Sequence, residues 1–179
     1  MRGKFAWSFV AVILLIAPGF AYESLQQAYN NAGPLGEYDK CVQLNPEVEY
    51  AGDLSIYGDQ AVCIEGNGAL IHGRNYGISI GVWGSRLDVF NCAIVGGSYG
   101  IYYGTGAKGE AHSNTIVDCA ECGLAAIYPN FQAGLEVWDN IITDCYYGIY
   151  CIEEYHPSYI GYNTVYSTTS YRYAEFCPG

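Results

Sequence analysis

Hydrophobic positions follow two different periods along the chain. Apolar side chains in residues 24–32 recur at helical spacing, starting after Ser24, which can cap a helix, and stopping at Gly33-Pro34. From Cys41 onward apolar and polar residues alternate in short runs, and glycine, asparagine and aspartate separate the runs. This pattern predicts one short N-terminal helix followed by many short strands.

Two series of residues recur at nearly constant spacing. One contains the glycines of short YGI or CGL phrases, 23, 23 and 25 residues apart: Gly77, Gly100, Gly123 and Gly148. The other contains asparagines spaced by 24, 23, 26 and 23 residues: Asn67, Asn91, Asn114, Asn140 and Asn163. Interleaved series with one period indicate a repeat architecture, in which each unit buries its apolar face by stacking on its neighbours. Each turn of the repeat should hold about three short strands and three bends.

The flanking apolar residues predict how each turn is built. An apolar residue stands on either side of each asparagine, as expected where two strands meet at a bend. Asparagine tolerates left-handed backbone, and its amide can bond to the equivalent amide one turn away. We therefore expect a structural ladder, with Cys92 in place of Asn91, formed by Asn67, Asn114, Asn140 and Asn163. After each glycine we expect one inward residue (Ile78, Ile101, Leu124, Ile149) and then one outward residue (Ser79, Tyr102, Ala125, Tyr150).

The repeats resemble those of the right-handed parallel β-helix family, the pectin-lyase-like superfold. The resemblance is carried by Asn114-Thr115-Ile116…Gly123-Leu124 and Asn140-Ile141-Ile142…Gly148-Ile149, and it covers roughly residues 24–170. It implies an all-β, single-stranded parallel β-helix of about 5–6 turns with a short capping helix. Residues 22–40 would form the N-terminal cap, 41–170 the turns and 171–179 a C-terminal tail. The family contains lyases, hydrolases, epimerases and non-catalytic surface proteins, so the fold does not fix an activity.

The first 21 residues are typical of a secretory signal peptide. Arg2 and Lys4 precede an apolar run from Phe5 to Ala17, and small residues follow at a cleavage site. The run is too short to span a membrane comfortably, so we expect a secreted or extracytoplasmic protein without a transmembrane anchor.

Charge limits the classes of partner that we expect, and the cysteines indicate possible disulfides. Without the signal peptide, 5 basic residues stand against 18 acidic ones, which disfavours nucleic acid and anionic membranes as partners. All 8 cysteines lie after the signal peptide, and an exported chain permits disulfides, although 8 cysteines allow 105 pairings. Cys119 and Cys145 should lie about one strand spacing apart, either as a disulfide or as buried thiols.

Stacking brings acidic residues into one outward-facing column. Asp88, Glu110 and Glu136 should occupy equivalent positions in consecutive turns, with Phe90, His112 and Trp138 beside them. Like charges on adjacent strands are unfavourable, so the column favours a cation, a raised pKa or a sugar ligand, or simply a solvated polar face. Glu110, His112 and Glu136 are the catalytic candidates, and Asp88, Phe90 and Trp138 are ligand-binding candidates.

Two further sets of residues are candidates for binding. Tyr102 and Tyr150 lie on the face that forms the substrate groove in the enzymes of the resembled family. Asp118 and Asp144 follow the ladder asparagines at one spacing and should bond to backbone amides in turns, with calcium as the alternative. No cofactor is required by the sequence.

Our preferred hypothesis is a carbohydrate-associated surface protein that binds polysaccharide without robust catalysis. The first alternative is a polysaccharide lyase, epimerase or glycosidase, which would need a groove with a basic residue or two convergent carboxylates. The second is a structural or adhesive envelope protein. An open last turn would also permit end-to-end self-association.

Overall fold

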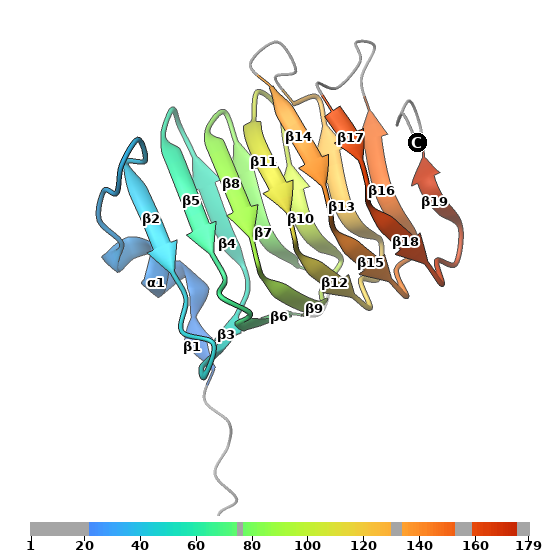
Figure 1. Ribbon diagram of the computed structural model, residues 1–179, viewed down its shortest axis with the longest axis horizontal. Coiled ribbons are helices and arrows are strands. Elements are labelled where there is room, and N and C mark those ends of the chain that lie inside the picture. The colour runs from blue at the N-terminus through green and yellow to red at the C-terminus, as the bar shows by residue number, and fades with distance from the viewer. Residues whose placement is uncertain (1–21, 75–76, 130–133, 153–158, 175–179) are drawn as a thin grey trace, which may run out of the picture.

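The computed structural model describes residues 22–74, 77–129, 134–152 and 159–174. The chain coils into an all-β parallel solenoid of about six turns with one short helix near the N-terminus (Figure 1). The prediction of a parallel β-helix is confirmed.

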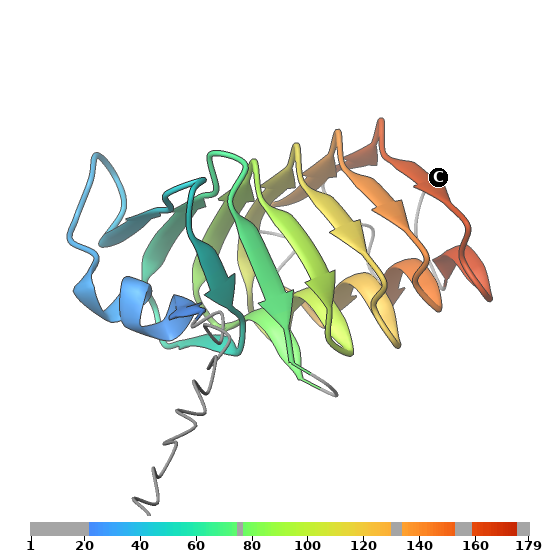
Figure 2. The ribbon, with the colours of Figure 1, turned by 90° about the horizontal axis from the view of Figure 1, so that it is seen from below.

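Helix α1 (Leu25–Asn31) lies at the N-terminal end of the solenoid (Figure 2). The Ser24 hydroxyl accepts a hydrogen bond from the Gln27 amide, and the Ala32 amide donates to the carbonyl of Ala28 at the other end. Leu25 and Tyr29 are buried, so the apolar face of α1 packs on the first turn and covers it as predicted.

Three parallel sheets run the length of the molecule, and every turn contributes one strand to each. Sheet 1 consists of β2 (Lys40–Gln43), β5 (Ala61–Glu65), β8 (Arg86–Phe90), β11 (Lys108–His112), β14 (Leu135–Trp138) and β17 (Tyr159–Gly161). Sheet 2 consists of β1 (Glu23–Ser24), β3 (Glu49–Ala51), β6 (Leu70–Gly73), β9 (Ala93–Gly96), β12 (Thr115–Val117), β15 (Ile141–Thr143) and β18 (Thr164–Tyr166). Sheet 3 consists of β4 (Leu54–Tyr57), β7 (Ile78–Trp83), β10 (Tyr99–Tyr103), β13 (Cys122–Ile127), β16 (Tyr147–Ile152) and β19 (Tyr171–Ala174). The strands therefore continue past residue 170.

The core is a set of apolar columns that run along the solenoid axis. Each column contains one inward residue per turn, and strand register keeps its members aligned. Sheet 2, for example, contributes Ile71, Ile94, Ile116, Ile142 and Val165, all buried. Burying a branched aliphatic side chain contributes about 1.5–3 kcal/mol, so these columns supply the main driving force for stacking.

An asparagine ladder runs along the bend between sheets 1 and 2. The Asn114 amide donates to the side-chain oxygen of Asn140 at 3.0 Å, and the Asn140 amide donates to that of Asn163 at 2.9 Å. Cys92 occupies the preceding position, where its backbone amide donates to the Asn114 side chain.

Asn67 is not part of this ladder. The bend between β5 and β6 has four residues where the later bends have two, so Ala69 takes the ladder position and the Asn67 side chain donates to the Leu44 carbonyl instead. Asn67 has the expected left-handed backbone, with φ of +53°. In the later bends the left-handed residue is instead the one before each ladder position, namely Asn91, Ser113, Asp139 and Tyr162.

The phase of β7 in sheet 3 also differs from the prediction. Ile80, and not Ile78, pairs with Ile101, so Ile80 is the inward residue of that turn. In the outward column Gly81 consequently replaces Ser79 opposite Tyr102.

A disulfide joins Cys41 on β2 to Cys63 on β5. The two residues are direct register partners, with Cα atoms 4.5 Å apart. The bond therefore links the first two turns covalently, next to the helix that covers this end.

Candidate functional site

The outer face of sheet 1 brings the predicted acidic column together. Glu110 pairs with Asp88 on β8 and with Glu136 on β14, so three carboxyl groups stand on consecutive strands. Adjacent strands lie about 4.8 Å apart, which makes their mutual repulsion significant. Cys63 precedes the acids in this column and Tyr159 follows them.

Asp88 differs from the other two acids because its side chain is buried and fully engaged. Arg86 forms a two-point ion pair with it, at 2.7 Å from Nη2 and 3.3 Å from Nε. The Tyr38 hydroxyl donates at 2.7 Å and the Glu110 backbone amide at 3.0 Å. Burial and the hydrogen bond to Asp88 raise the pKa of Tyr38 to about 12. Asp88 thus anchors the segment between α1 and β2 and has no lone pair left for a ligand.

Glu110 and Glu136 have side chains that are free to meet a ligand. Their carboxylates make no hydrogen bond or ion pair within the described part of the chain. Burial, then the charges of Asp88 and Glu136, raise the pKa of Glu110 above its ordinary value.

The backbone around Glu110 is rigidly held. The Tyr103 hydroxyl, buried in the core, lies 2.8 Å from the Glu110 carbonyl. Gly109 has φ of +124°, and a Cβ there would stand 2.2 Å from the Leu87 carbonyl oxygen, so only glycine fits. This conformation presents the Glu110 side chain at a fixed place on the sheet.

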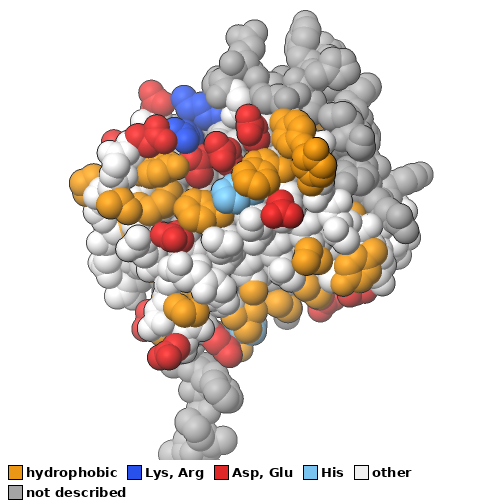
Figure 3. Space-filling view, in the orientation of Figure 1, with side chains coloured by type: hydrophobic (Ala, Val, Ile, Leu, Met, Phe, Trp, Pro, Cys, Tyr) orange, Lys and Arg blue, Asp and Glu red, His pale blue; other side chains and the backbone are white. Residues whose placement is uncertain are grey.

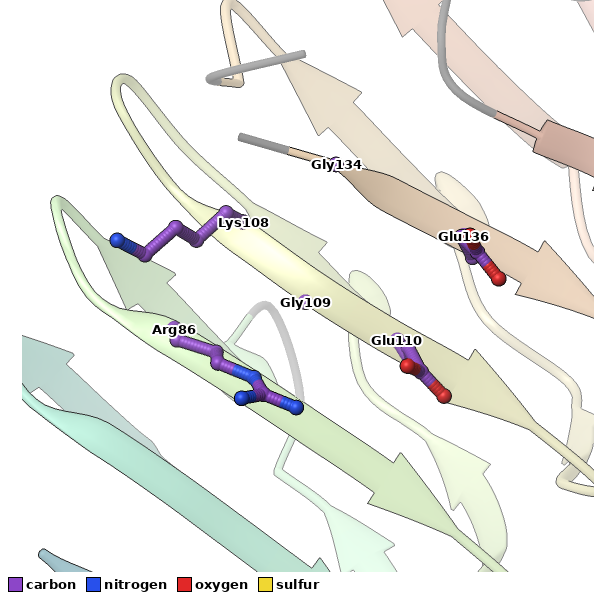
Figure 4. Close-up of a pocket in the computed structure, with 6 residues that line it drawn as sticks. All are labelled: Arg86, Lys108, Gly109, Glu110, Gly134 and Glu136. Atoms are coloured by element: carbon purple, nitrogen blue, oxygen red, sulfur yellow. The ribbon is translucent and has the colours of Figure 1, made fainter. Parts of the chain in front are cut away.

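A polar pocket of about 360 Å³ lies beside these two acids. Its lining, drawn in Figure 4, consists of Arg86, Lys108, Gly109, Glu110, Gly134 and Glu136. Arg86 and Lys108 stand at the start of β8 and β11, and the glutamates stand further along β11 and β14 (Figure 4). Arg86 and Lys108 are one repeat apart and pair in register, so stacking of the turns brings the two basic residues together.

The two basic groups of the pocket are used differently. The Arg86 guanidinium is occupied by Asp88 and by Glu37, which lies 3.1 Å from Nη1. Lys108 makes no ion pair with the described residues, so its ammonium group is available. The pocket therefore offers one free cation and two free carboxylates, a mixed set of hydrogen-bond partners.

Three rings stack beside the pocket on the same face. Phe90 and His112 have centroids 5.1 Å apart and planes within 2°, and His112 and Trp138 are 4.3 Å apart and within 8°. Figure 3 shows the histidine between hydrophobic side chains, with acidic groups next to them. Phe90 and Trp138 each stack on the central His112 ring through one face. Both faces of the His112 ring are covered by these neighbours, so only its ring nitrogens can make polar contacts.

The tyrosines proposed as ligand contacts lie on a different face. Tyr102 and Tyr150 belong to sheet 3, separated by the fully buried Ala125. Tyr102 packs against Trp83 at 5.5 Å, and burial raises its pKa. The structure therefore does not bring Tyr102 or Tyr150 together with the acidic column.

Asp118 and Asp144 lie at the bend between sheets 2 and 3. Both adopt left-handed backbone, and Asp144 accepts a hydrogen bond from the Thr143 hydroxyl at 3.0 Å. Among the described residues no three histidine, cysteine or acidic side chains gather closely enough to hold a metal ion. Calcium at this bend stays a prediction.

Comparison with known proteins agrees with this architecture. A family model described as the right handed beta helix region matches residues 37–171. The chain belongs to the right-handed β-helix family. No curated protein and no solved structure matches it. Membership of this family is consistent with a carbohydrate-associated protein. In the part of the chain that the structure describes, no helix is long and apolar enough to cross a bilayer.

Proposed function

We propose that this chain is an exported protein that binds polysaccharide through the pocket on sheet 1. The observation that carries the proposal is the pair Glu110 and Glu136, two neighbouring carboxylates that have no partner among the described residues and lie beside a polar pocket. Sugar hydroxyls are hydrogen-bond donors that such carboxylates accept well. Lys108 supplies a complementary donor, and the Trp138 ring supplies apolar contact area next to it.

Substitutions on each face distinguish binding on sheet 1 from binding on sheet 3. Trp138→Ala and Glu136→Gln should weaken retention on a polysaccharide gel or glycan array at least several-fold. Tyr102→Ala, on the other face, should leave retention unchanged. If Tyr102→Ala weakened retention and the two sheet 1 variants did not, the binding surface would be on sheet 3. If the wild-type chain were retained on no glycan, the structural or adhesive alternative would be favoured.

A catalytic role is the second candidate, favoured by the pKa of Glu110. A carboxyl group with a raised pKa beside a second carboxyl group is the arrangement used for acid and base roles in sugar chemistry. In that case the wild-type chain should release reducing ends or unsaturated products from its polysaccharide, and Glu110→Gln should abolish the release while retaining binding. Binding without any product would eliminate this candidate.

Export is supported by the signal-like residues 1–21, which lie outside the described residues, and by the Cys41–Cys63 disulfide, which fits an oxidising compartment. Mature protein recovered outside the cytoplasm should begin near Tyr22. N-terminal sequencing tests this, and an intact N-terminus on the recovered protein would contradict it.

A further inference from the structure

We propose that Cys119 and Cys145 form a second disulfide between consecutive turns. They occupy equivalent places in two successive bends between sheets 2 and 3. Val117 pairs with Thr143 two residues earlier, and the amide of Tyr146 donates to the carbonyl of Cys119. Cys119 and Cys145 are therefore one turn apart at equivalent positions, as are Cys41 and Cys63, which are joined by a disulfide.

The local backbone sends both thiols in the same direction. The residues immediately before them, Asp118 and Asp144, have φ of +59° and +56°, so the two bends begin with the same backbone conformation. Each sulfur lies 3.4 Å from the Cβ position of a glycine in sheet 3, Gly100 for Cys119 and Gly123 for Cys145. Those glycines are themselves one turn apart, so the sulfurs stand over each other along the axis.

The two thiols already interact. The interaction between them raises the pKa of Cys119 and lowers that of Cys145. Both residues are buried, at 2% and 0% exposure, so a bulky oxidant cannot reach them in the finished fold. Oxidation therefore has to precede closure of these turns.

The reaction is thiol–disulfide exchange with a small or protein disulfide, such as oxidised glutathione. The Cys145 thiolate attacks one sulfur of the oxidant and releases one thiol, forming a mixed disulfide. The Cys119 thiolate then attacks the Cys145 sulfur and releases the second thiol. Overall, two protein thiols are oxidised and one oxidant disulfide is reduced to two thiols.

The other unassigned cysteines of the described turns have no cysteine at the equivalent place of a neighbouring turn. Cys92 stands in the ladder position next to Asn114, and Cys122 pairs in register with Tyr99 and Tyr147. The predicted bond would join two turns in the C-terminal half, as Cys41–Cys63 does in the N-terminal half.

Peptide mapping tests the bond directly. The full mature chain is refolded with reduced and oxidised glutathione, alkylated in denaturant and cleaved after glutamate without reduction. Cys119 then lies in peptide 111–121 and Cys145 in peptide 137–153, while peptides 38–47 and 50–65 carry Cys41 and Cys63. We expect both linked pairs, each separating on reduction. A linked 38–47/50–65 pair together with alkylated Cys119 and Cys145 would overturn the proposal.

Two variants identify the partner within peptide 137–153, which also contains Cys151. Cys145→Ser should abolish the link to peptide 111–121, whereas Cys151→Ser should preserve it. If the link to peptide 111–121 were lost in Cys151→Ser and retained in Cys145→Ser, the partner of Cys119 would be Cys151, and the proposed pairing would be refuted.

Discussion

Charged residues on sheet 1 act in two ways, and burial decides which. Asp88 is 3% exposed and each of its oxygens is satisfied, so it holds the segment that contains Tyr38 against the sheet. The carboxylates of Glu110 and Glu136 have no hydrogen bond to that segment and no other partner in the part of the chain that the structure describes. One column of equivalent positions therefore contains a structural acid followed by two acids available to a ligand.

Replacing Asp88 should destabilise the protein because it leaves Arg86 and Tyr38 without their buried acceptor. Removing one partner of a buried ion pair costs about 3–5 kcal/mol, so we expect Asp88→Asn to lower the free energy of unfolding by about 3 kcal/mol in urea titration. The control is Asp53→Asn, whose pair with Arg74 is exposed and should matter by less than about 1 kcal/mol. Equal effects of the two substitutions would show that Asp88 is not the anchor described above.

Glu110 should make stability depend on pH in a defined direction. Because its pKa is raised in the fold, the protonated form is favoured there, and its contribution to stability is complete below the ordinary pKa of glutamate. That contribution is lost as pH rises through the raised pKa. Glu110→Gln should therefore gain stability over the wild type between about pH 4 and 7. Urea unfolding across that range measures the difference, and Glu47→Gln, an exposed residue in another bend, should follow the wild-type profile.

At the scale of elements, the bends determine which residues align. Asn114, Asn140 and Asn163 align because the bends between sheets 1 and 2 that precede β12, β15 and β18 have two residues each. The earlier bend at Asn67 has four, and the connection before Ile80 is likewise two residues longer than the one before Ile101. In each case the two extra residues shift the aligned position by two, from Asn67 to Ala69 and from Ile78 to Ile80, which spacing alone does not reveal.

Loss of one ladder asparagine should cost far more than loss of Asn67. The Asn140 amide donates to Asn163 and to the Ala111 carbonyl, and its oxygen accepts from Asn114, all in a buried bend. Asn140→Ala leaves these groups without partners, at about 1–3 kcal/mol for each buried unsatisfied group. We expect a drop in unfolding free energy of at least about 2 kcal/mol by this reasoning, against less than about 1 kcal/mol for Asn67→Gly, because glycine tolerates the left-handed backbone at this exposed site. A comparable loss at both sites would contradict the ladder as the stabilising feature.

At the scale of the whole molecule, periodicity explains what sequence analysis could and could not supply. The columns of Asp88, Glu110 and Glu136 and of Phe90, His112 and Trp138 follow from one repeat length and were placed correctly. The burial of Asp88 did not follow, because a non-repeating segment folds back over it. The stacking of ring on ring was also missed. A period fixes which residues are neighbours, whereas the rotamer of each ring decides whether its face or edge meets solvent.

The two ends of a solenoid differ from its middle because their strand edges have a neighbour on one side only. Helix α1 contacts β1, β2 and β4, one strand from each sheet, and so covers the N-terminal end. Leu25 is fully buried in that contact, and Leu→Ala at such a site costs about 2–5 kcal/mol. We expect Leu25→Ala to lower the unfolding free energy by this amount and to make the protein associate at high concentration, as judged by light scattering. Gln27→Ala on the exposed side of α1 should change neither quantity. If Leu25→Ala lost stability but stayed monomeric, the helix would add packing energy without protecting the strand edges; end-to-end association would then have to begin elsewhere.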